Sequence, residues 1–350
     1  MAPTIFLTGG TGYIGGSVLH ALVTAHPEYD ITVLLRKTPE AFTSAYPNVK
    51  IVQGNYDSAE TLAEHAKQAD VVVHNGDSDH EPSLNALISG LLSKSTKSHL
   101  LHLSGTGIIS DWASPEHLGT RNPKVYSDVD DIAAIAALPD HALHRNTEKI
   151  LFQTAASMVR KLESRSCVRR MVRLCTSFSL YGPGAGPGNT QSAFTRFFIA
   201  DATTLAGNRV FYTGAGTNTR FWVHISDLTS LYVRVVEAAL ADAPTFSGPG
   251  KYPGYYFAST QEHAHVDVAR AIGEVLVTKG VIADAEPVEV GLDVVDRMAQ
   301  HPSFSQFGRY MYAANARTRA VRAEKAFGYA GRAEGLLASQ EVEVVAALGR

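Results

Sequence analysis

The first sixteen residues place a strand, a glycine-rich turn and a helix in direct succession. Residues 4–8 form an apolar, strand-like run, glycine stands at positions 9, 10, 12, 15 and 16, and a helical pattern continues from Val18. Both G-x-G-x-x-G and G-x-x-G-x-x-G fit this turn, and either spacing lets the backbone approach a pyrophosphate without intervening Cβ atoms. The first turn of a helix also exposes N–H groups and a positive dipole end, which bind phosphate. The sequence therefore predicts a dinucleotide site.

Strands and helices alternate after this turn. Apolar runs at 31–35, 49–52, 69–74 and 100–103 predict strands, and helical patterns separate them. This rhythm predicts a right-handed, doubly wound parallel sheet with its ligand at the carboxyl ends of the strands. A helix over roughly 141–164 and a strand at 171–175 continue the pattern, and the Gly/Pro cluster 181–188 marks the exit from the regular domain. We expect an α/β Rossmann domain over 1–182, to which later segments return, and a smaller C-terminal α+β substrate lobe with a helical tail over 183–350.

Composition favours small-molecule chemistry. The 350 residues are 45% hydrophobic with a formal net charge of -3, so there is no basic footprint for nucleic acid or an anionic membrane surface. We expect a cytoplasmic protein, since no apolar run reaches transmembrane length and no signal peptide is evident. Cys167 and Cys175 are too few for a disulfide framework or a cysteine-rich metal site. His263 and His265 lack further ligands at zinc-site spacing, which predicts surface histidines and no metal.

The end of the second strand indicates which dinucleotide binds. An acidic residue there would select NAD by binding the ribose diol, whereas this chain has Arg36 and Lys37, which suit the 2′-phosphate of NADP(H). Asp57, after the third strand, is placed either to accept from the adenine amino group or to cap the following helix. The remaining predicted cofactor residues lie in the glycine turn and at later strand ends: Gly9, Thr11, Gly12, Tyr13, Ile14, Gly15, Asn75, Gly76, Ser104 and Ser177.

These motifs give the chain a family resemblance over nearly its whole length. The glycine turn, Asp57, the Ser104–Gly107 segment, Tyr-Gly-Pro-Gly at 181–184 and Val-His-Ile-Ser-Asp-Leu at 223–228 occur in the order typical of one superfamily. The chain resembles the extended members of the short-chain dehydrogenase/reductase superfamily, namely the NAD-dependent epimerase/dehydratase group and dihydroflavonol-reductase-like enzymes. The resemblance implies hydride transfer at a nicotinamide, a substrate lobe over the Rossmann domain, and a homodimer.

The catalytic pattern of that superfamily is incomplete here. It combines a Ser or Thr after the fifth strand with Tyr-x-x-x-Lys on the next helix, so that tyrosine transfers the substrate proton. In this chain Ser104 and Thr106 are present, but His144 stands at the tyrosine position and Glu148 at the lysine position. Tyr126 is followed four residues later by an aspartate. The chain is therefore predicted to be an atypical member that lacks the usual pair.

Three functions are compatible with this pattern. The first is an NADP(H)-dependent oxidoreductase acting on a small carbonyl or related C=X substrate, with His144 as proton donor, Ser104 or Thr106 in support and Tyr126 folded over the site. The second is an NADP(H)-binding redox sensor without turnover, in which His144 only begins a helix. The third is a sugar-nucleotide epimerase or dehydratase. Arg220 and Trp222 are predicted to contact an acidic or aromatic substrate from the C-terminal lobe.

Overall fold

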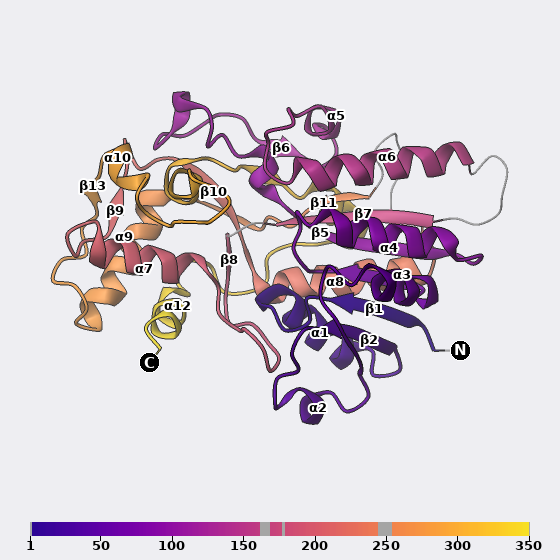
Figure 1. Cartoon of the computed structure of the whole chain (residues 1–350). Coiled ribbons are helices and arrows are strands. Elements are labelled where there is room, and N and C mark those ends of the chain that lie inside the picture. The colour runs from indigo at the N-terminus through magenta and orange to yellow at the C-terminus, as the bar shows by residue number, and fades with distance from the viewer. Residues whose placement is uncertain (1, 162–168, 177–178, 244–253, 350) are drawn as a thin grey trace.

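A computed structural model describes residues 2–161, 169–176, 179–243 and 254–349. Within these residues, seven parallel strands form a central sheet in the order β3, β2, β1, β4, β5, β7, β11 (Figure 1). Their bounds are β1 (Thr4–Thr8), β2 (Asp30–Leu35), β3 (Lys50–Gln53), β4 (Val71–His74), β5 (Ser98–Gly105), β7 (Arg169–Thr176) and β11 (Tyr255–Phe257). The strand order reverses between β1 and β4, where a doubly wound sheet binds its ligand. The predicted Rossmann fold is confirmed.

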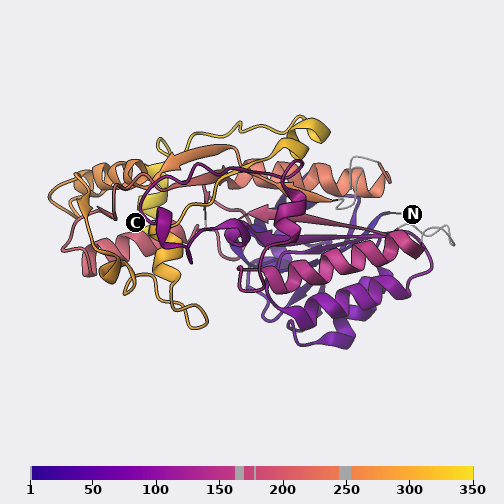
Figure 2. The ribbon, with the colours of Figure 1, turned by 90° about the horizontal axis from the view of Figure 1, so that it is seen from above.

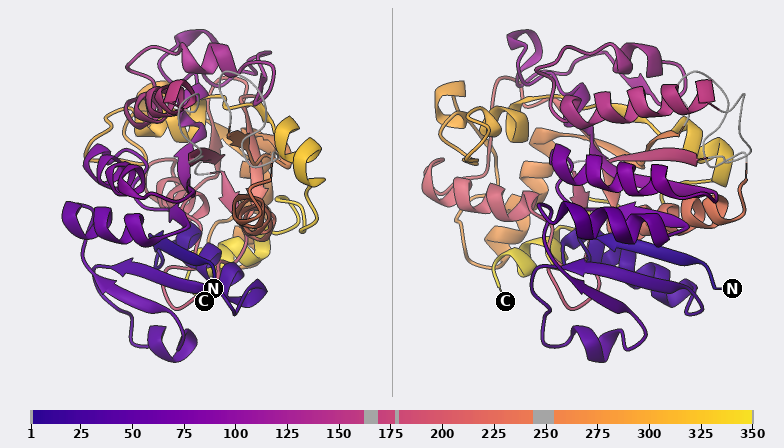
Figure 3. Two further views of the ribbon diagram at one scale, coloured as in Figure 1. Left: turned by 90° about the vertical axis from the view of Figure 1, so that its right-hand side faces the viewer. Right: turned by 45° about the vertical axis from the view of Figure 1, so that its right-hand side comes forward.

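Helices cover both faces of the sheet (Figures 2 and 3). One face carries α1 (Tyr13–Ala25) and α8 (Ile225–Leu240), and the other carries α3 (Ala59–Gln68), α4 (Glu81–Ser93) and α6 (Arg145–Lys161). Alternate side chains of β1 pack on opposite faces of the sheet. Ile5 and Leu7 belong to the core under α1 and α8, and Phe6 belongs to the core under α3 and α4. Covering both faces explains why the strands are apolar throughout instead of alternating with polar residues.

The C-terminal lobe lies beyond the carboxyl ends of the strands, on the left of Figure 1. It contains a three-stranded sheet in the order β12, β10, β8 and a two-stranded sheet of β13 and β9. Its elements are β8 (Leu180–Tyr181), α7 (Phe194–Thr204), β9 (Phe211–Tyr212), β10 (Thr219–His224), β12 (Gln261–Ala264), α9 (His265–Thr278), β13 (Val288–Glu289), α10 (Leu292–Val295), a π-helical turn (Arg309–Ala313) and α12 (Gln340–Ala347). An aromatic core holds this lobe together, with ring pairs such as Phe198–Phe211 at 4.6 Å.

Segments from the second half of the chain return to the Rossmann part. Strand β11 pairs with β7, and α8 packs against α1. A further pair joins β14 (Thr318–Arg319) to β6 (Tyr126–Ser127), near the turn η1 (Thr106–Ile109) and α5 (Ile132–Ala136), and α11 (Val321–Phe327) packs on β11. The short helix α2 (Phe42–Ala45) follows β2. None of the described helices is long and apolar enough to cross a membrane.

One helix begins later than its sequence pattern predicts. The expected helix over roughly 141–164 starts at Arg145, because His144 has a left-handed backbone with φ of 61° and therefore cannot continue a helix toward the N-terminus. The last described residue of this helix is Lys161. This shift places His144 at the helix entrance, where its side chain faces the strand ends.

Candidate active site

The glycine turn is packed so closely that Gly9 and Gly15 leave no room for a side chain. Gly9 has φ of 77°, and a Cβ atom on it would lie 2.2 Å from the carbonyl oxygen of Asn75. A Cβ atom on Gly15 would lie 2.2 Å from the carbonyl oxygen of Gly9, so this glycine lets α1 approach β1. Gly12 precedes α1, and a Cβ atom there would meet only the Gly9 carbonyl, at 3.4 Å. Gly12 thus faces open space beside the first N–H groups of the helix.

Two pockets meet at this turn. The outer pocket has a volume of about 610 Å³ and the inner pocket about 310 Å³, and both are lined by Gly12, Asn75 and Gly76. The structure therefore places most predicted cofactor residues along one continuous path. The outer pocket adds Gly9, Thr11, Arg36 and Lys37, and the inner pocket adds Tyr13, Ile14, Gly15 and Ser104.

The outer pocket is cationic at its far end. Arg36 and Lys37 are exposed at the end of β2 and line it, and the described lining includes no carboxylate. Asp57 does not line the pocket, whereas its neighbours Asn55 and Tyr56 do. The Asp57 carboxylate lies 3.2 Å from Nε2 of His80 instead. The adenine contact of Asp57 therefore stays a prediction, as does the binding of a ribose phosphate by Arg36 and Lys37.

Asn75 joins the two pockets and has one free hydrogen-bond donor. Its side-chain oxygen accepts a hydrogen bond of 2.7 Å from the hydroxyl of Tyr232. Its side-chain nitrogen is buried and has no partner among the described residues. An unsatisfied buried donor costs free energy of roughly 1–3 kcal/mol. A ligand oxygen at the junction of the pockets would remove that cost, so Asn75 and the glycine turn together fit a pyrophosphate.

His144 lines the inner pocket and is oriented by a carboxylate. Its Nδ1 lies 2.8 Å and 3.0 Å from the two carboxylate oxygens of Asp79, and 3.2 Å from the hydroxyl of Ser78. Because a carboxylate only accepts hydrogen bonds, Nδ1 carries the proton in this pair. The other ring nitrogen, Nε2, faces Gly105, where a Cβ atom would lie only 2.1 Å away. The glycine at position 105 therefore makes room for the imidazole.

The backbone of His144 is strained. A non-glycine residue in the left-handed region costs about 1–2 kcal/mol, and such strain clusters at functional sites. The carbonyl of His144 also accepts the N–H of Glu148 at 3.1 Å, so this residue directly precedes α6 and accepts its first hydrogen bond. The helix-starting role and the pocket-lining role are thus combined in one residue, and helix initiation alone does not require a histidine.

A row of buried polar side chains crosses the sheet beside Ser104. The registers Thr8–His74, His74–His102 and His102–Arg173 place these four residues side by side on β1, β4, β5 and β7. Burial lowers the pKa of His74 to about 4 and the pKa of His102 well below its usual range, so both rings are neutral near pH 7. Ser104, two residues after His102 on the same face of β5, has a buried hydroxyl that makes no hydrogen bond of standard geometry to the described residues but lies near the Glu148 carboxylate.

The row ends in a buried ion pair. Nε of Arg173 lies 3.1 Å from a carboxylate oxygen of Glu148, and neither side chain is exposed. Burial raises the pKa of Glu148, while Arg173 and the nearby Ser104 hydroxyl lower it. Thus Glu148, which stands at the lysine position of the superfamily, carries the opposite charge and is neutralised by an arginine from β7.

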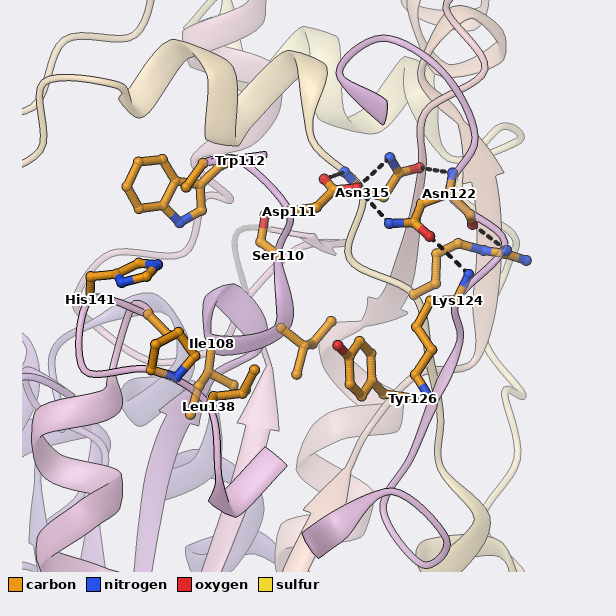
Figure 4. A pocket seen from close by; sticks show the side chains of 15 residues that line it. Ile108, Ser110, Asp111, Trp112, Asn122, Lys124, Tyr126, Leu138, His141 and Asn315 are labelled. Atoms are coloured by element: carbon orange, nitrogen blue, oxygen red, sulfur yellow. Dashed lines mark hydrogen bonds between the residues drawn. The ribbon is translucent and has the colours of Figure 1, made fainter. Parts of the chain in front are cut away.

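Several predicted residues lie elsewhere. Thr106 is fully buried in η1 and does not line the inner pocket. Tyr126 lines a separate cavity together with Trp112 and His141 (Figure 4), so the structure gives no support for Tyr126 folded over Ser104 and His144. Ser177, Cys167 and the side chain of Cys175 lie outside the part of the chain that the structure describes.

The two predicted substrate residues of the lobe are buried behind the inner pocket. The guanidinium of Arg220 lies 4.7 Å from the centre of the Tyr310 ring, and it is Tyr310 that lines the pocket. Trp222 is 3% exposed and packs edge-on against Phe194 in the lobe core. Neither side chain reaches the wall of the inner pocket, so their predicted contact with a substrate has no support in this arrangement.

The prediction that His263 and His265 are surface residues is wrong for His265. This ring is 6% exposed within the aromatic core of the lobe, where burial lowers its pKa to about 3. The two-residue spacing at the junction of β12 and α9 does not reveal this, because the chain changes direction there. Among the described residues, no group of three or more histidine, cysteine or acidic side chains is arranged to hold a metal ion.

Sequence reasoning missed several residues of the inner pocket. Ser78, in the loop after β4, lines this pocket, and Leu180, Ala193 and Tyr310 line it from the lobe. Asp79, in the same loop as Ser78, does not line the pocket but contacts His144. The only available signal for Asp79 was its place in a loop at the carboxyl end of a strand. The lobe residues have no local signature, since they meet the pocket only through tertiary packing.

Comparison with known proteins agrees with this geometry. The model of the NmrA-like family matches residues 1–88. The chain is 31% identical over 342 residues to the oxidase ucsJ of an Acremonium species, covering 94% of this chain and 93% of that protein. It is 26% identical over 245 residues to dTDP-glucose 4,6-dehydratase of Mycobacterium tuberculosis, covering 67% and 68%. The crystal structure of dTDP-glucose 4,6-dehydratase from Bacillus anthracis in complex with NAD superposes with a TM-score of 0.61 at 16% identity, covering 99% and 97%.

The fold and the glycine turn thus define a Rossmann protein with a site at its topological switch point. The chain belongs to the extended short-chain dehydrogenase/reductase superfamily.

Proposed function

We propose that this protein is an NADP(H)-dependent oxidoreductase that acts on the carbonyl or related C=X group of a small, largely apolar molecule. One observation carries the proposal: Ser104 and an Asp79-oriented His144 line the same inner pocket, which opens onto the glycine turn. The oxidase from Acremonium and the NAD complex of the Bacillus anthracis dehydratase support redox chemistry with a nicotinamide dinucleotide in this superfamily.

The residues of the outer pocket favour NADP(H) over NAD(H). Gly12, the start of α1 and Asn75 would hold the pyrophosphate, and Arg36 and Lys37 would bind the 2′-phosphate. The described wall holds two cations and no carboxylate. The two hydroxyls of an NAD(H) ribose would therefore lack the acidic side chain that usually accepts their hydrogen bonds. A phosphate dianion is the group that this end of the pocket suits best.

The side chains of the inner pocket bind the substrate oxygen and transfer the proton. When bound, the cofactor supplies a hydride to the substrate carbon. The Ser104 hydroxyl donates a hydrogen bond to the substrate oxygen, and the protonated His144 transfers its Nε2 proton to that oxygen. Asp79 accepts the Nδ1 hydrogen and stabilises the charged ring, as a carboxylate does for a catalytic histidine. In the oxidation direction, neutral His144 takes the proton back.

The walls of the inner pocket indicate the substrate class. Ile14, Leu103, Leu180 and Ala193 surround the polar pair of Ser104 and His144. Burying apolar surface against such walls is favourable by about 25 cal/mol per Å², whereas a sugar hydroxyl would find few partners there. This composition favours a small apolar carbonyl compound over the sugar nucleotides used by the dehydratases.

The cofactor assignment is tested by titrating the protein with NADPH and NADH. Replacing Arg36 and Lys37 with alanine together removes charge-assisted bonds to the phosphate, and we expect NADPH affinity to fall about 10- to 100-fold while NADH affinity stays nearly constant. The Lys67→Ala variant, which removes an exposed cation on α3, is the control for general charge effects. An equal loss for both cofactors would contradict the assignment.

The catalytic assignment is tested by NADPH oxidation with a panel of aliphatic and aromatic carbonyl compounds. His144→Phe should abolish turnover and leave NADPH binding intact, and Asp79→Asn should lower turnover about 10²- to 10⁴-fold. Asp77→Asn, in the same loop, is the matched control. Unchanged turnover in His144→Phe would remove this residue from the mechanism. NADPH binding without oxidation of any panel member would instead favour the redox sensor, and NAD(H) retained through purification would favour the epimerase or dehydratase.

A further inference from the structure

A second cavity lies on the other side of η1 from the inner pocket. Its volume is about 210 Å³, and its lining shares no residue with that of the inner pocket. The walls come from the end of η1 and the residues after it (108–113), the segment 122–126 that leads into β6, the segment 138–142 before His144, and Asn315 and Arg317 (Figure 4). We call it the tryptophan cavity, after Trp112. It is therefore a separate space, and two of its wall segments continue the chain from Ser104 and lead into His144.

The charged side chains of the tryptophan cavity are already engaged. Each finds its partner within the described residues: Asp111 accepts from the side-chain amides of Asn122 and Asn315 at 2.9 and 3.0 Å, Lys124 lies 2.6 Å from Asp131, and Arg317 lies 2.8 Å from Glu262. Both cations are paired with carboxylates, whereas Asp111 bonds only to neutral amides, so an anionic ligand would enter without a free counter-charge and would lose its hydration. The cavity thus selects against anions.

Aromatic rings form its opposite sides. Figure 4 shows Trp112 and His141 on one side and Tyr126 on the other, with Ser110 between them. The Trp112 ring is held edge-on against Phe304 at 4.7 Å, and the Tyr126 ring is held by the Lys124 ammonium at 4.8 Å. Rings fixed in this way lose little entropy when a further ring packs between them.

Two hydroxyl groups can orient a ligand in the cavity. The Ser110 hydroxyl oxygen is buried without a partner among the described residues. Burial raises the pKa of Tyr126, so its phenol stays protonated and able to donate. A ligand with one hydroxyl or carbonyl oxygen would satisfy these groups without introducing a charge. As for size, a cavity of about 150 Å³ already holds benzene in another protein, so a substituted single ring fits here.

We propose that the tryptophan cavity is a binding site for a neutral, single-ring aromatic molecule that carries a hydroxyl or carbonyl group. The ring packs between Trp112 and Tyr126, and its oxygen bonds to Ser110. The site is independent of the proposed reaction, because its lining contains neither Ser104 nor His144.

The test is a calorimetric titration of the full-length protein with phenol, benzoate and cyclohexanol. We expect phenol to bind at least about tenfold more tightly than benzoate, which carries a charge, and than cyclohexanol, whose ring is not aromatic. Trp112→Ala and Ser110→Ala should each weaken phenol binding several-fold, while Trp112→Phe, which keeps a ring, should largely retain it. His144→Phe should leave phenol binding unchanged, since that residue belongs to the inner pocket.

Two results would overturn the proposal. One is benzoate binding as tightly as phenol, and the other is phenol binding that neither Trp112→Ala nor Ser110→Ala weakens. Circular dichroism checks that each variant is folded. If Trp112→Ala fails to fold, the Ser110→Ala variant, which removes only one oxygen atom, still decides the test. Since the readout is binding in the absence of cofactor, failure here is distinguishable from failure of the proposed redox activity.

Discussion

The buried pair of Glu148 and Arg173 allows a sharp stability prediction. The two charges are 3.1 Å apart and fully buried, and the Arg173 guanidinium lies 4.1 Å from the centre of the Phe152 ring. With an effective dielectric constant of about 20, their attraction is about 5 kcal/mol, which offsets a desolvation cost of several kcal/mol per ion. Removing one partner loses the attraction but keeps the other desolvation cost. We expect Arg173→Met to lower the free energy of unfolding by about 3–5 kcal/mol.

Removing both charges should reverse most of that loss. The double variant Glu148→Met with Arg173→Met leaves no uncompensated charge, and similar replacements in other proteins are neutral or stabilising. Lys149→Met is the matched control on the same helix, because Lys149 pairs with Asp140 on the surface at 2.9 Å, where solvent screens the interaction. Urea unfolding followed by circular dichroism at neutral pH measures all four proteins, the parent chain included.

An Arg173→Met variant no less stable than Lys149→Met would contradict a cost from an unpaired buried charge. A double variant as unstable as Arg173→Met alone would contradict it equally, since the loss would then come from packing. A stable double variant would also permit NADPH titration, which shows whether the pair contributes to the site as well as to the fold.

Two further predictions concern histidines near the site. His144→Gly should be about 1–2 kcal/mol more stable than His144→Ala, because only glycine adopts the left-handed backbone without strain; equal denaturation midpoints would contradict this. Because the folded protein holds the pKa of His74 near 4, below its value of about 6.5 when unfolded, protons bind the unfolded chain preferentially and stability should fall as pH drops from about 6.5 toward 4. The pKa of the neighbouring His102 is lowered in the same way, so His102→Leu should make the free energy of unfolding, measured with urea, fall less steeply with decreasing pH. An unchanged dependence on pH would argue against a buried neutral ring at this position.

Much of the cofactor path was predictable because it depends on local backbone. The glycine turn, the strand ends at Arg36 and Asn75, and Ser104 each follow a strand directly, and parallel strands bring their carboxyl ends to one edge. Asp57 also follows a strand, yet its side chain points to His80 instead of the pocket. Local order along the chain fixes which loop a residue occupies, but the direction of its side chain depends on neighbours from other elements.

The arrangement of the proposed catalytic residues was only partly predictable from the sequence. The sequence singled out His144 by its position on the helix, but the Asp79 carboxylate that orients it comes from a loop 65 residues earlier. Tyr126 was predicted to fold over the site only because tyrosine can transfer a proton. In the structure β6, which contains Tyr126, pairs with β14, and Tyr126 lines the tryptophan cavity.

By itself, the sequence determined the Rossmann fold, the glycine turn and the cationic end of the second strand, because hydrophobic periodicity and glycine conformations act within a few residues. Only the tertiary structure decided that Glu148 pairs with Arg173, that Asp79 orients His144 and that Arg220 lies behind Tyr310. These contacts join segments far apart in the chain, and the energies that select them arise from burial and packing that exist only once the sheet, the helices and the lobe have assembled.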